Sequence, residues 1–457
     1  MSELGTEGHP LRVAIVGSGP SGFYALEALL KSGKTVTVDI IERLPAPFGL
    51  VRNGVAPDHP KLKQAILVYQ KIAQSPDFRL FANVTVGRDV TVDELRDLYH
   101  AVVFTCGAES DRKLGIPGED LKGSHTATEF VGWYNGHPDY RDRAFDLSCE
   151  TAVIIGQGNV AADVARILSK TVDELRHTDI AEHALDALSK SKIKEVHVIG
   201  RRGPAQAKFT PKELREFGEL ADCAPVVRPE DLKLNAESEV ELADKTNAAS
   251  ATNLQIFTAF AGADPGGKHR RCIFHFLEGP LRLEGEGRLE RVVLAKNRLE
   301  GEPFHQSAKD TGESYALGCG ILFRSIGYRG VPMAGVPFDE RRGVFANTDG
   351  RITENGKAVP GLYVAGWIKR GPTGIIGTNR ACAVGTVGSL MADLPALAGG
   401  AKKGGEGLAE LLKGRSVRVV TYADWCKIDA AEIGRGEPKG KPREKFTRVA
   451  EMLAAIG

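Results

Sequence analysis

Two glycine-rich turns, each directly after an apolar run, constrain the fold of this chain more than any other feature. The first, VAIVGSGPSG at residues 13–22, contains Gly17, Gly19 and Gly22 in the spacing G-x-G-x-x-G. The second, TAVIIGQGNV at residues 151–160, has the same shape. A continuous apolar run that ends in glycines is typical of a buried parallel strand, and a helix after it begins a βαβ unit. The sequence therefore predicts two such units in one chain.

In the first turn, each glycine has its own task in binding a dinucleotide. The first allows a tight turn, the second lets the backbone approach a pyrophosphate, and the third lets helix and strand pack closely. The helical stretch PSGFYALEALLKSG follows, and then the strand TVTVDIIE, which ends at Glu42. A carboxylate about 20 residues after the third glycine accepts hydrogen bonds from ribose hydroxyls. We therefore predict a dinucleotide site that includes Gly17, Gly19, Gly22 and Glu42.

The second turn has Gly156, Gly158 and Ala161 in the form G-x-G-x-x-A, and Arg201 and Arg202 follow the next strand, KEVHVIG. An extra helical stretch around residues 173–190 accounts for the long spacing before the arginines. Guanidinium groups at this place pair with a ribose 2′-phosphate, so the second nucleotide is predicted to be NADP(H) rather than NAD(H). Surface arginines without a ligand are the alternative. Together, the two turns indicate FAD in the first site and NADPH in the second.

The order of the remaining patterns indicates two interleaved domains. AVVFTCG (101–107) is typical of a buried strand, and GILFRSIG (320–327) is predicted to be the last strand of the second lobe, after antiparallel strands around ERVVLAKNRLEG. We predict an α/β fold of two Rossmann-like domains with three layers and mostly parallel sheets. Residues 1–108 and 327–457 would bind FAD, and the inserted residues 109–326 would bind NADP. After about residue 395 we expect a Gly/Lys-rich linker and a partly irregular extension containing GRGEPKGKPREKF.

Composition excludes several classes of partner. Sixty basic and 59 acidic residues give a formal net charge of +1, which does not favour nucleic acid or an anionic membrane surface. No apolar stretch approaches the roughly 18–20 residues of a membrane span, and the N-terminus resembles neither a secretion signal nor a transit peptide, so we expect a cytoplasmic location. The 7 cysteines are widely spaced. They predict no metal site and no redox-active disulfide, so electrons would pass directly to an external acceptor.

Five longer stretches resemble the adrenodoxin reductase family, which includes bacterial ferredoxin-NADP reductases. In order, from about residue 11 to about 392, they are VDIIERLPAPFGLVRNGVAPDHPKLK, IIGQGNVAADVARIL, VIGRRGPAQAKFTPKELRE, SIGYRG and GLYVAGWIKRGPTGIIGTN. The resemblance implies an FAD-containing reductase that passes electrons from NADPH to a [2Fe–2S] ferredoxin. An NADPH-dependent flavin oxidase or monooxygenase is an alternative. So is a redox-sensing interaction module.

The same resemblance implies individual contacts. It places FAD on Ser21, Glu42, Leu50, Val86, Trp367, Gly374, Ile375 and Ile376. It places NADP on Gln157, Gly158, Asn159, Val160, Arg201, Arg202, Glu213 and Gly374. Residues 377–379, GTN, are expected to cap a helix that points at the flavin. For Trp367 an ordinary core aromatic is the alternative.

His59 and Glu216 match positions that the family has near the nicotinamide. Direct hydride transfer needs no protein base, so these residues would orient the ring or tune its surroundings. A loop histidine and a helix-surface glutamate without a function are the alternatives.

Basic residues crowd one predicted helix of the second lobe. Lys208, Lys212 and Arg215 lie at or near TPKELREF, and KHRR at 268–271 adds further positive charge. The resemblance implies an acidic ferredoxin, which a local basic surface would attract. The alternative is a charged face that only contacts solvent. This alternative is stronger for KHRR than for Lys208, Lys212 and Arg215.

Overall fold

The computed structural model describes residues 3–397 and 400–457, and the chain forms two compact units. Unit 1 comprises residues 1–110 and 327–457, and unit 2 comprises residues 111–326. Each unit contains its own sheet and its own cores. Unit 2 is therefore an insertion in the chain of unit 1.

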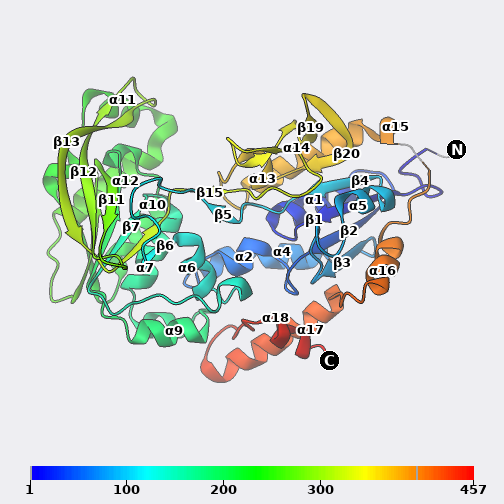
Figure 1. Cartoon of the computed structure of the whole chain (residues 1–457), viewed down its shortest axis with the longest axis horizontal. Helices are drawn as coiled ribbons and strands as arrows, with labels where there is room; N and C mark the ends of the chain where they lie inside the picture. Colours follow the sequence, from blue (N-terminus) through cyan, green and yellow to red (C-terminus); the bar gives the residue numbers. More distant parts are fainter. Residues whose placement is uncertain (1–2, 398–399) are drawn as a thin grey trace. The chain divides into compact units, whose positions relative to one another are not determined.

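A seven-stranded sheet forms the centre of unit 1 (Figure 1). Its order is β18 (Asn347–Thr348), β19 (Arg351–Glu354), β20 (Lys357–Val364), β4 (Ala101–Phe104), β1 (Leu11–Val16), β2 (Val36–Glu42) and β3 (Phe78–Ala82). The pairs from β20 to β3 are parallel, and β18, β19 and β20 pair antiparallel. Two short ladders pair β5 (Ser110–Asp111) with β15 (Tyr328–Arg329) and β16 (Phe338–Asp339) with β17 (Val344–Phe345).

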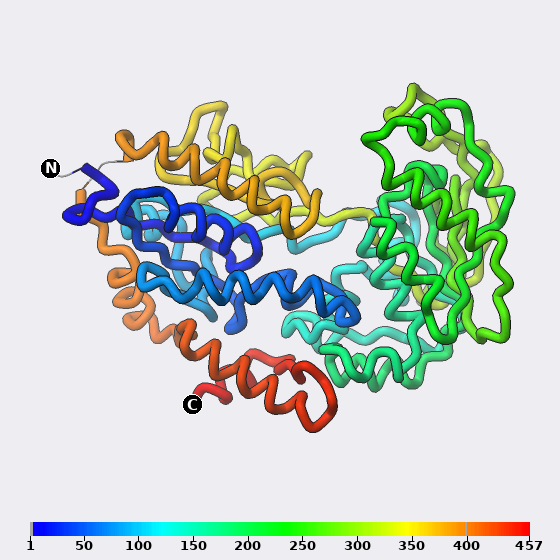
Figure 2. The backbone as a smooth tube through the Cα atoms, turned by 180° about the vertical axis from the view of Figure 1, so that it is seen from behind, coloured from blue at the N-terminus to red at the C-terminus, as the bar shows by residue number. Residues whose placement is uncertain are grey.

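Helices cover both faces of this sheet, which explains why β1 is apolar throughout. Val13 and Ile15 belong to the core on one face, and Ala14 and Val16 belong to the core on the other. Helices α1 and α14 lie side by side on the first face, as Figure 2 shows from behind. The helices of unit 1 are α1 (Pro20–Leu30), α2 (Gly49–Asn53), α3 (Pro60–Lys63), α4 (Ala65–Ile72), α5 (Val92–Leu98), α13 (Trp367–Arg370), α14 (Thr378–Ala392), α15 (Leu394–Leu397), α16 (Gly405–Gly414), α17 (Tyr422–Gly436) and α18 (Val449–Ala454).

The C-terminal region is irregular over residues 440–447, as expected, but α16, α17 and α18 give it regular structure on either side. The predicted Gly/Lys-rich linker, residues 397–408, includes residues 398–399, which lie outside the described residues. Its last residues, from Gly405 on, already belong to helix α16. Trp425 and Ile428 of α17 and Met452 of α18 join the main core of unit 1. Glycines and lysines dominate the local composition here, whereas long-range packing of a few apolar residues decides the structure.

Unit 2 is built in three layers, as expected. Its parallel sheet has the order β6 (Ser124–Thr126), β14 (Ile321–Arg324), β7 (Thr151–Ile155), β8 (Glu195–Ile199), β10 (Arg270–His275) and β9 (Cys223–Val227). One face packs on α6 (Ala127–Tyr134), α7 (Asn159–Ser169), α9 (Glu182–Ser189), α10 (Pro211–Arg215) and α12 (Ala248–Ala261). The other face packs on an antiparallel sheet of β11 (Glu278–Glu284), β12 (Arg291–Glu300) and β13 (Ser307–Gly318). Two further helices are α8 (Val172–Leu175) and α11 (Ala236–Ala243).

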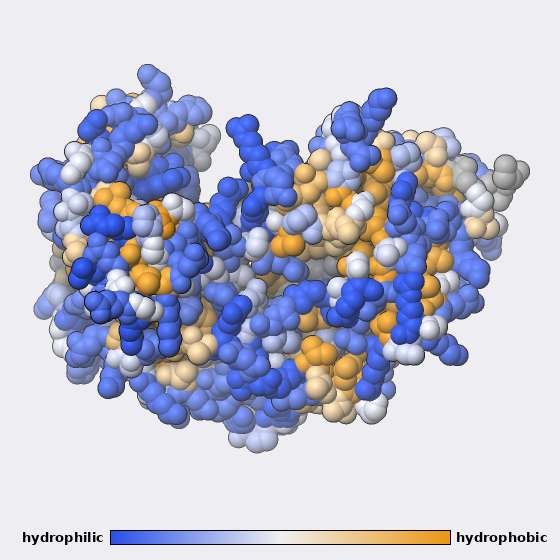
Figure 3. Space-filling view, in the orientation of Figure 1, coloured by the Kyte–Doolittle hydropathy of each residue, from blue (hydrophilic) through white to orange (hydrophobic). Residues whose placement is uncertain are grey.

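Figure 3 shows the hydropathy of one face of each unit. The visible faces of both units are mostly hydrophilic in Figure 3, with apolar residues in small separate groups. Within residues 3–397 and 400–457, no helix combines the length and apolar character that crossing a membrane requires.

A buried charged group ties β11 to its neighbours in unit 2. Glu278 is fully buried and accepts hydrogen bonds from Arg228 (2.9 Å), Tyr315 (2.5 Å) and Lys296, and it pairs with His275 at 3.1 Å. Burial alone would raise the pKa of Glu278, but the hydrogen bonds from His275, Lys296 and Tyr315 outweigh it and hold the pKa far below its usual value. The ionised carboxylate therefore contributes to the stability of this unit.

The stability of unit 2 is expected to depend on pH through this residue. Because the folded-state pKa is lowered, the contribution is complete above the unfolded value of about 4.3 and is lost as pH falls below it. Glu278→Gln should cost at least about 2 kcal/mol at pH 7, because an amide nitrogen cannot accept the contacts that Arg228 and Lys296, or Tyr315 and His275, make with one carboxylate oxygen. Urea unfolding of both proteins between pH 7 and pH 3 measures the difference, which should shrink only below about pH 4. A difference that stays constant over this range would contradict the assignment.

Candidate functional site

The first glycine-rich turn joins the end of β1 to the start of α1. Gly17 has φ +106°, a conformation that favours glycine, and its N–H donates to the Ile41 carbonyl of β2 (2.8 Å). A Cβ on Gly22 would lie 2.2 Å from the Gly17 oxygen, so only glycine allows helix and strand to approach this closely. Gly19 is the N-cap of α1 and supplies no side-chain cap. The N-terminus of α1 therefore has room for a phosphate close to the backbone. The positive end of the helix dipole would attract that phosphate.

Glu42 lies directly beneath this turn. Its Oε2 accepts hydrogen bonds from the N–H (3.1 Å) and the hydroxyl (2.6 Å) of Ser18, and its Oε1 accepts from the Leu44 N–H (3.0 Å). An ionised carboxylate has about four acceptor positions, so one remains for a ribose hydroxyl. The carboxylate therefore both braces the turn and can bind a nucleotide.

Two further glycines bring distant segments to the same turn. A Cβ on Gly49 would lie 2.9 Å from the Gly19 Cα, which places α2 and its half-exposed Leu50 against the turn. A Cβ on Gly366 would lie 2.1 Å from the Ser21 hydroxyl oxygen, which brings the start of α13 to α1. Sequence reasoning did not single out either glycine, because no local pattern reveals these contacts.

Trp367 follows Gly366 and carries a polar atom that the protein leaves without a partner. Its indole Nε1 is buried and has no hydrogen-bond partner among the described residues. The ring stacks on Tyr328, with centroids 5.5 Å apart. A buried indole N–H normally finds an acceptor, so this donor fits a bound ligand such as the flavin dinucleotide.

The loop before α14 does not provide the helix cap that we expected from residues 377–379. Gly374 has φ +82°, Ile375 is 67% exposed, and the Ile375 N–H donates to the Thr378 hydroxyl (3.2 Å). Thr378 is the first residue of α14, and the N-cap Gly377 supplies no side-chain bond, so the expected GTN cap of the helix is wrong. The hydroxyl closes the loop instead, and the first amides of α14 donate to backbone carbonyls of the loop, Thr378 to Ile375 (3.0 Å) and Asn379 to Ile376 (3.2 Å). Val86 lies in a turn where it pairs with Val90, and it packs against the core cluster that contains Val16, the last residue of β1.

Gly22→Ala is expected to weaken FAD binding at least tenfold. The added Cβ would force α1 away from β1 and disturb the backbone that faces the pyrophosphate. Flavin fluorescence during titration of the apoprotein measures the dissociation constant. Gly388→Ala is the control, since this exposed position in α14 has no atom within 4 Å of the new Cβ and alanine favours a helix. Equal FAD affinity in the two variants would contradict the role of Gly22.

The second turn, between β7 and α7, repeats this geometry. Gly156 has φ +136°, and a Cβ there would lie 2.1 Å from the Ser325 oxygen. Side chains of the turn brace it: Gln157 Nε2 donates to the His275 carbonyl (2.7 Å), and Asn159 Oδ1 accepts from the Thr210 N–H (2.8 Å). Gly158 is the N-cap and leaves the start of α7, including Val160, without a side-chain cap. This turn therefore fits a second pyrophosphate.

Arg201 and Arg202 follow β8 beside the second turn. Arg201 is exposed and Arg202 is half-buried, and neither guanidinium forms an ion pair with a described residue. Burial and the adjacent charge of Arg201 lower the pKa of Arg202. Two neighbouring cations without a paired anion favour a dianionic ligand. They therefore fit the 2′-phosphate of NADP.

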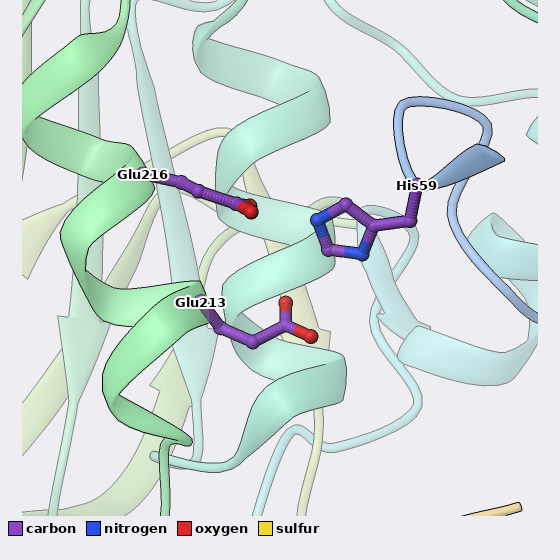
Figure 4. A group of neighbouring side chains, drawn as sticks. All are labelled: His59, Glu213 and Glu216. Atoms are coloured by element: carbon purple, nitrogen blue, oxygen red, sulfur yellow. The ribbon is translucent and has the colours of Figure 1, made fainter. Parts of the chain in front are cut away.

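Glu213 and Glu216 share a buried arginine. Figure 4 shows both carboxylates projecting from the same side of the segment formed by α10 and the 3₁₀ turn after it. Arg166 of α7 is fully buried and contacts Asp163 (2.7 Å), Glu213 (3.2 Å) and Glu216 (3.6 Å). Sequence reasoning missed Arg166, although a cation on the apolar face of a helix was a usable signal. The two glutamates thus have a partner within unit 2.

His59 belongs to unit 1, where it is the N-cap of α3. It is 7% exposed, and its backbone N–H donates to the Ala56 carbonyl (3.0 Å). A role beside the nicotinamide stays a prediction.

The two basic clusters, one around α10 and one at residues 268–271, differ in their hydrogen bonds to the rest of unit 2. Lys208, Lys212 and Arg215 are exposed. In KHRR, by contrast, Lys268 donates to the Leu220 carbonyl (2.7 Å), and Arg270 donates to the last carbonyls of α7, at Ser169 (3.2 Å) and Lys170 (2.9 Å). The second cluster stabilises the unit, and the first remains available to a partner.

Comparison with known proteins agrees with this geometry. The family model described as pyridine nucleotide-disulphide oxidoreductase matches residues 11–219. NADPH-ferredoxin reductase FprA of Mycobacterium tuberculosis is 46% identical over 97% of this chain and 98% of its own length. The human mitochondrial NADPH:adrenodoxin oxidoreductase is 44% identical over 98% of this chain and 92% of its own.

The fold agrees as well. The structure described as Mycobacterium tuberculosis FprA in complex with NADPH superposes with a TM-score of 0.93 at 45% identity, covering 98% of this chain and all of that one. The predicted α/β class and the resemblance are thereby confirmed. The chain belongs to the family that contains the NADPH-ferredoxin reductases and the NADPH:adrenodoxin oxidoreductases.

Proposed function

We propose that this chain is an NADPH-dependent ferredoxin reductase that uses FAD. The observation that carries the proposal is the pair of unlike nucleotide turns, one above Glu42 and one beside the unpaired Arg201 and Arg202. When bound, FAD accepts a hydride from NADPH and releases single electrons, which a one-electron iron–sulfur acceptor requires. The names of the relatives support this function over that of an oxidase.

In this function, the residues of the chain bind the two nucleotides and orient the nicotinamide. In unit 1, the backbone at Gly17, Gly19 and Gly22 binds the pyrophosphate of FAD, Glu42 accepts from its ribose, and Trp367 donates a hydrogen bond. Ser21, Leu50 and Val86 line the same site, as do Gly374, Ile375 and Ile376. In unit 2, Gly156, Gln157, Gly158, Asn159 and Val160 form the turn for NADP. Glu213 lies beside that turn, and His59 and Glu216 orient the nicotinamide.

Electrons leave this protein without passing through its cysteines. All seven cysteines are free thiols, and Cys223, Cys272 and Cys319 are buried. Burial raises the pKa of Cys223 to about 11 and of Cys319 to about 12, which keeps these two protonated and unreactive at neutral pH. The acceptor must therefore approach the flavin directly.

Anaerobic mixing with NADPH tests the function. The FAD-loaded protein should bleach on addition of NADPH, and a [2Fe–2S] ferredoxin should accelerate its reoxidation. Turnover that depends on O₂ and is unaffected by ferredoxin would establish an oxidase instead. Protein that stays colourless after reconstitution with FAD would exclude a flavoprotein altogether. A cytoplasmic location, expected from the sequence, stays a prediction.

The partner we propose is an acidic [2Fe–2S] ferredoxin that docks near Lys208, Lys212 and Arg215. Because exposed charges mainly steer association, Lys212→Glu with Arg215→Glu should raise the KM for ferredoxin about tenfold at low salt. Reduction of ferricyanide, which needs no docking, should hardly change. Lys190→Glu with Lys309→Glu, exposed in the same unit, is the control for net charge. An equal effect in the control would refute a local docking surface.

A further inference from the structure

A buried ion pair joins the first half of unit 1 to its C-terminal extension. Arg52, near the end of α2, donates two hydrogen bonds to the carboxylate of Glu432 in α17, at 2.8 and 2.6 Å. The two side chains are 4% and 0% exposed. Such a two-pronged pair fixes both distance and orientation between the elements that carry it.

Other groups of the extension hold the same arginine. The Arg52 guanidinium lies 5.1 Å from the ring centre of Trp425, about two turns before Glu432 in α17. The Lys445 ammonium donates to the Arg52 carbonyl (3.2 Å), and the Phe446 N–H donates to Glu432 Oε1 (2.9 Å). Both the side chain and the backbone of Arg52 are therefore bound by residues more than 370 positions later in the chain.

Helix α2 also contacts the first glycine-rich turn. The Phe48 N–H donates to the Ser18 carbonyl (3.1 Å), and Gly49 lies against Gly19. Leu50, the next residue, is 39% exposed. A helix of five residues is not stable by itself, so contacts with the rest of the fold determine its position. The Arg52 pair is one of these contacts, and both of its side chains are buried.

We propose that Arg52 and Glu432 are positioning residues for FAD, through which the C-terminal helix α17 holds α2 against the first turn. The inference rests on the proposed assignment of FAD to unit 1. A buried ion pair contributes little net stability compared with apolar side chains of the same volume, but it does define geometry. The function of this pair is accordingly to keep Leu50 and the backbone at Ser18 and Gly19 in the arrangement that accepts the cofactor.

Glu432→Gln tests this role by two measurements that do not need turnover. The FAD dissociation constant of the apoprotein, measured by flavin fluorescence, should rise at least tenfold. Hydrogen exchange at the amides of Gly54 and Val55, which both donate to the Leu50 carbonyl, should accelerate at least tenfold in the apoprotein. Arg52→Lys, which keeps the charge but loses the two-pronged geometry, should show an intermediate affinity.

A second two-pronged ion pair in unit 1, with both side chains 28% exposed, is the control. Arg351 binds Asp393 through two hydrogen bonds (2.7 and 2.9 Å) between β19 and the C-terminal end of α14. Asp393→Asn should lower the melting temperature but change neither FAD affinity nor exchange in α2 by more than twofold. If it changes FAD affinity as much as Glu432→Gln does, the effect is general destabilisation and the proposal is wrong.

A double variant covers the case in which Glu432→Gln fails to fold. Arg52→Met with Glu432→Leu removes both charges and leaves neither buried alone, so it should fold. FAD affinity should still fall at least tenfold, and the visible circular dichroism of the bound flavin should change. Unchanged affinity and spectrum would overturn the proposal while the proposed function stands. Wild-type protein that binds no FAD would instead overturn the proposed function.

Discussion

Replacing Arg201 and Arg202 together by alanine is expected to raise the KM for NADPH at least 100-fold and to leave the KM for NADH nearly unchanged. NADH lacks the 2′-phosphate, so it gains nothing from the two guanidinium groups. Each charge-assisted bond to a phosphate contributes about 1.5–3 kcal/mol, so losing two weakens binding by at least about 3 kcal/mol. That corresponds to a factor of more than 100 in affinity.

Steady-state kinetics with ferricyanide as acceptor measures both nucleotides without a contribution from ferredoxin docking. Single variants should each show roughly half of the free-energy change. Arg291→Ala with Arg298→Ala is the control, because both arginines are exposed on β12 and pair with glutamates of their own unit. Equal loss with NADPH and NADH would mean that the arginines support the turn in general, and the assignment to the 2′-phosphate would fail.

The central sheets could be predicted from sequence because their signals are local. In β1 and β7, an apolar run ends at a glycine with positive φ, and each element of that pattern lies within ten residues. Glu42 was also predictable, since it ends the strand next to the turn that it braces. The same holds for Arg201 and Arg202, which follow the strand paired with β7. In a parallel sheet, the carboxyl ends of adjacent strands lie at the same edge. Residues that follow those strands therefore lie close together.

The remaining features depend on contacts between distant segments. Gly49 and Gly366 are essential to the first site only because the backbone or side chain of another segment lies against them. The C-terminal region buries charged residues in ion pairs, Glu432 with Arg52 and Lys441 with Glu444, although its composition is typical of an irregular, solvated stretch. In KHRR, an arginine that looks like a free surface charge binds the end of a helix. No local pattern predicts these pairings, because the partner residue could stand anywhere in the chain.

Arg166→Met is expected to destabilise unit 2 by about 3–5 kcal/mol. The arginine is fully buried among the carboxylates of Asp163, Glu213 and Glu216, and methionine fills a similar volume without a charge. Removing the cation from a buried ionic group takes a partner from each carboxylate, and their desolvation then opposes folding more strongly. Since three carboxylates depend on one guanidinium, repulsion between them adds to this cost.

Urea unfolding of the full chain, followed by far-UV circular dichroism, measures this loss. Arg288→Met is the control, because its ion pair with Asp146 (3.0 Å) is about half exposed on both sides and should contribute less than about 1 kcal/mol. Adding Asp163→Asn and Glu213→Gln to Arg166→Met should restore part of the stability, since fewer charges are then left unpaired. If Arg166→Met is no less stable than the control, the carboxylates do not depend on this arginine, and Glu213 and Glu216 must be held in place by other contacts.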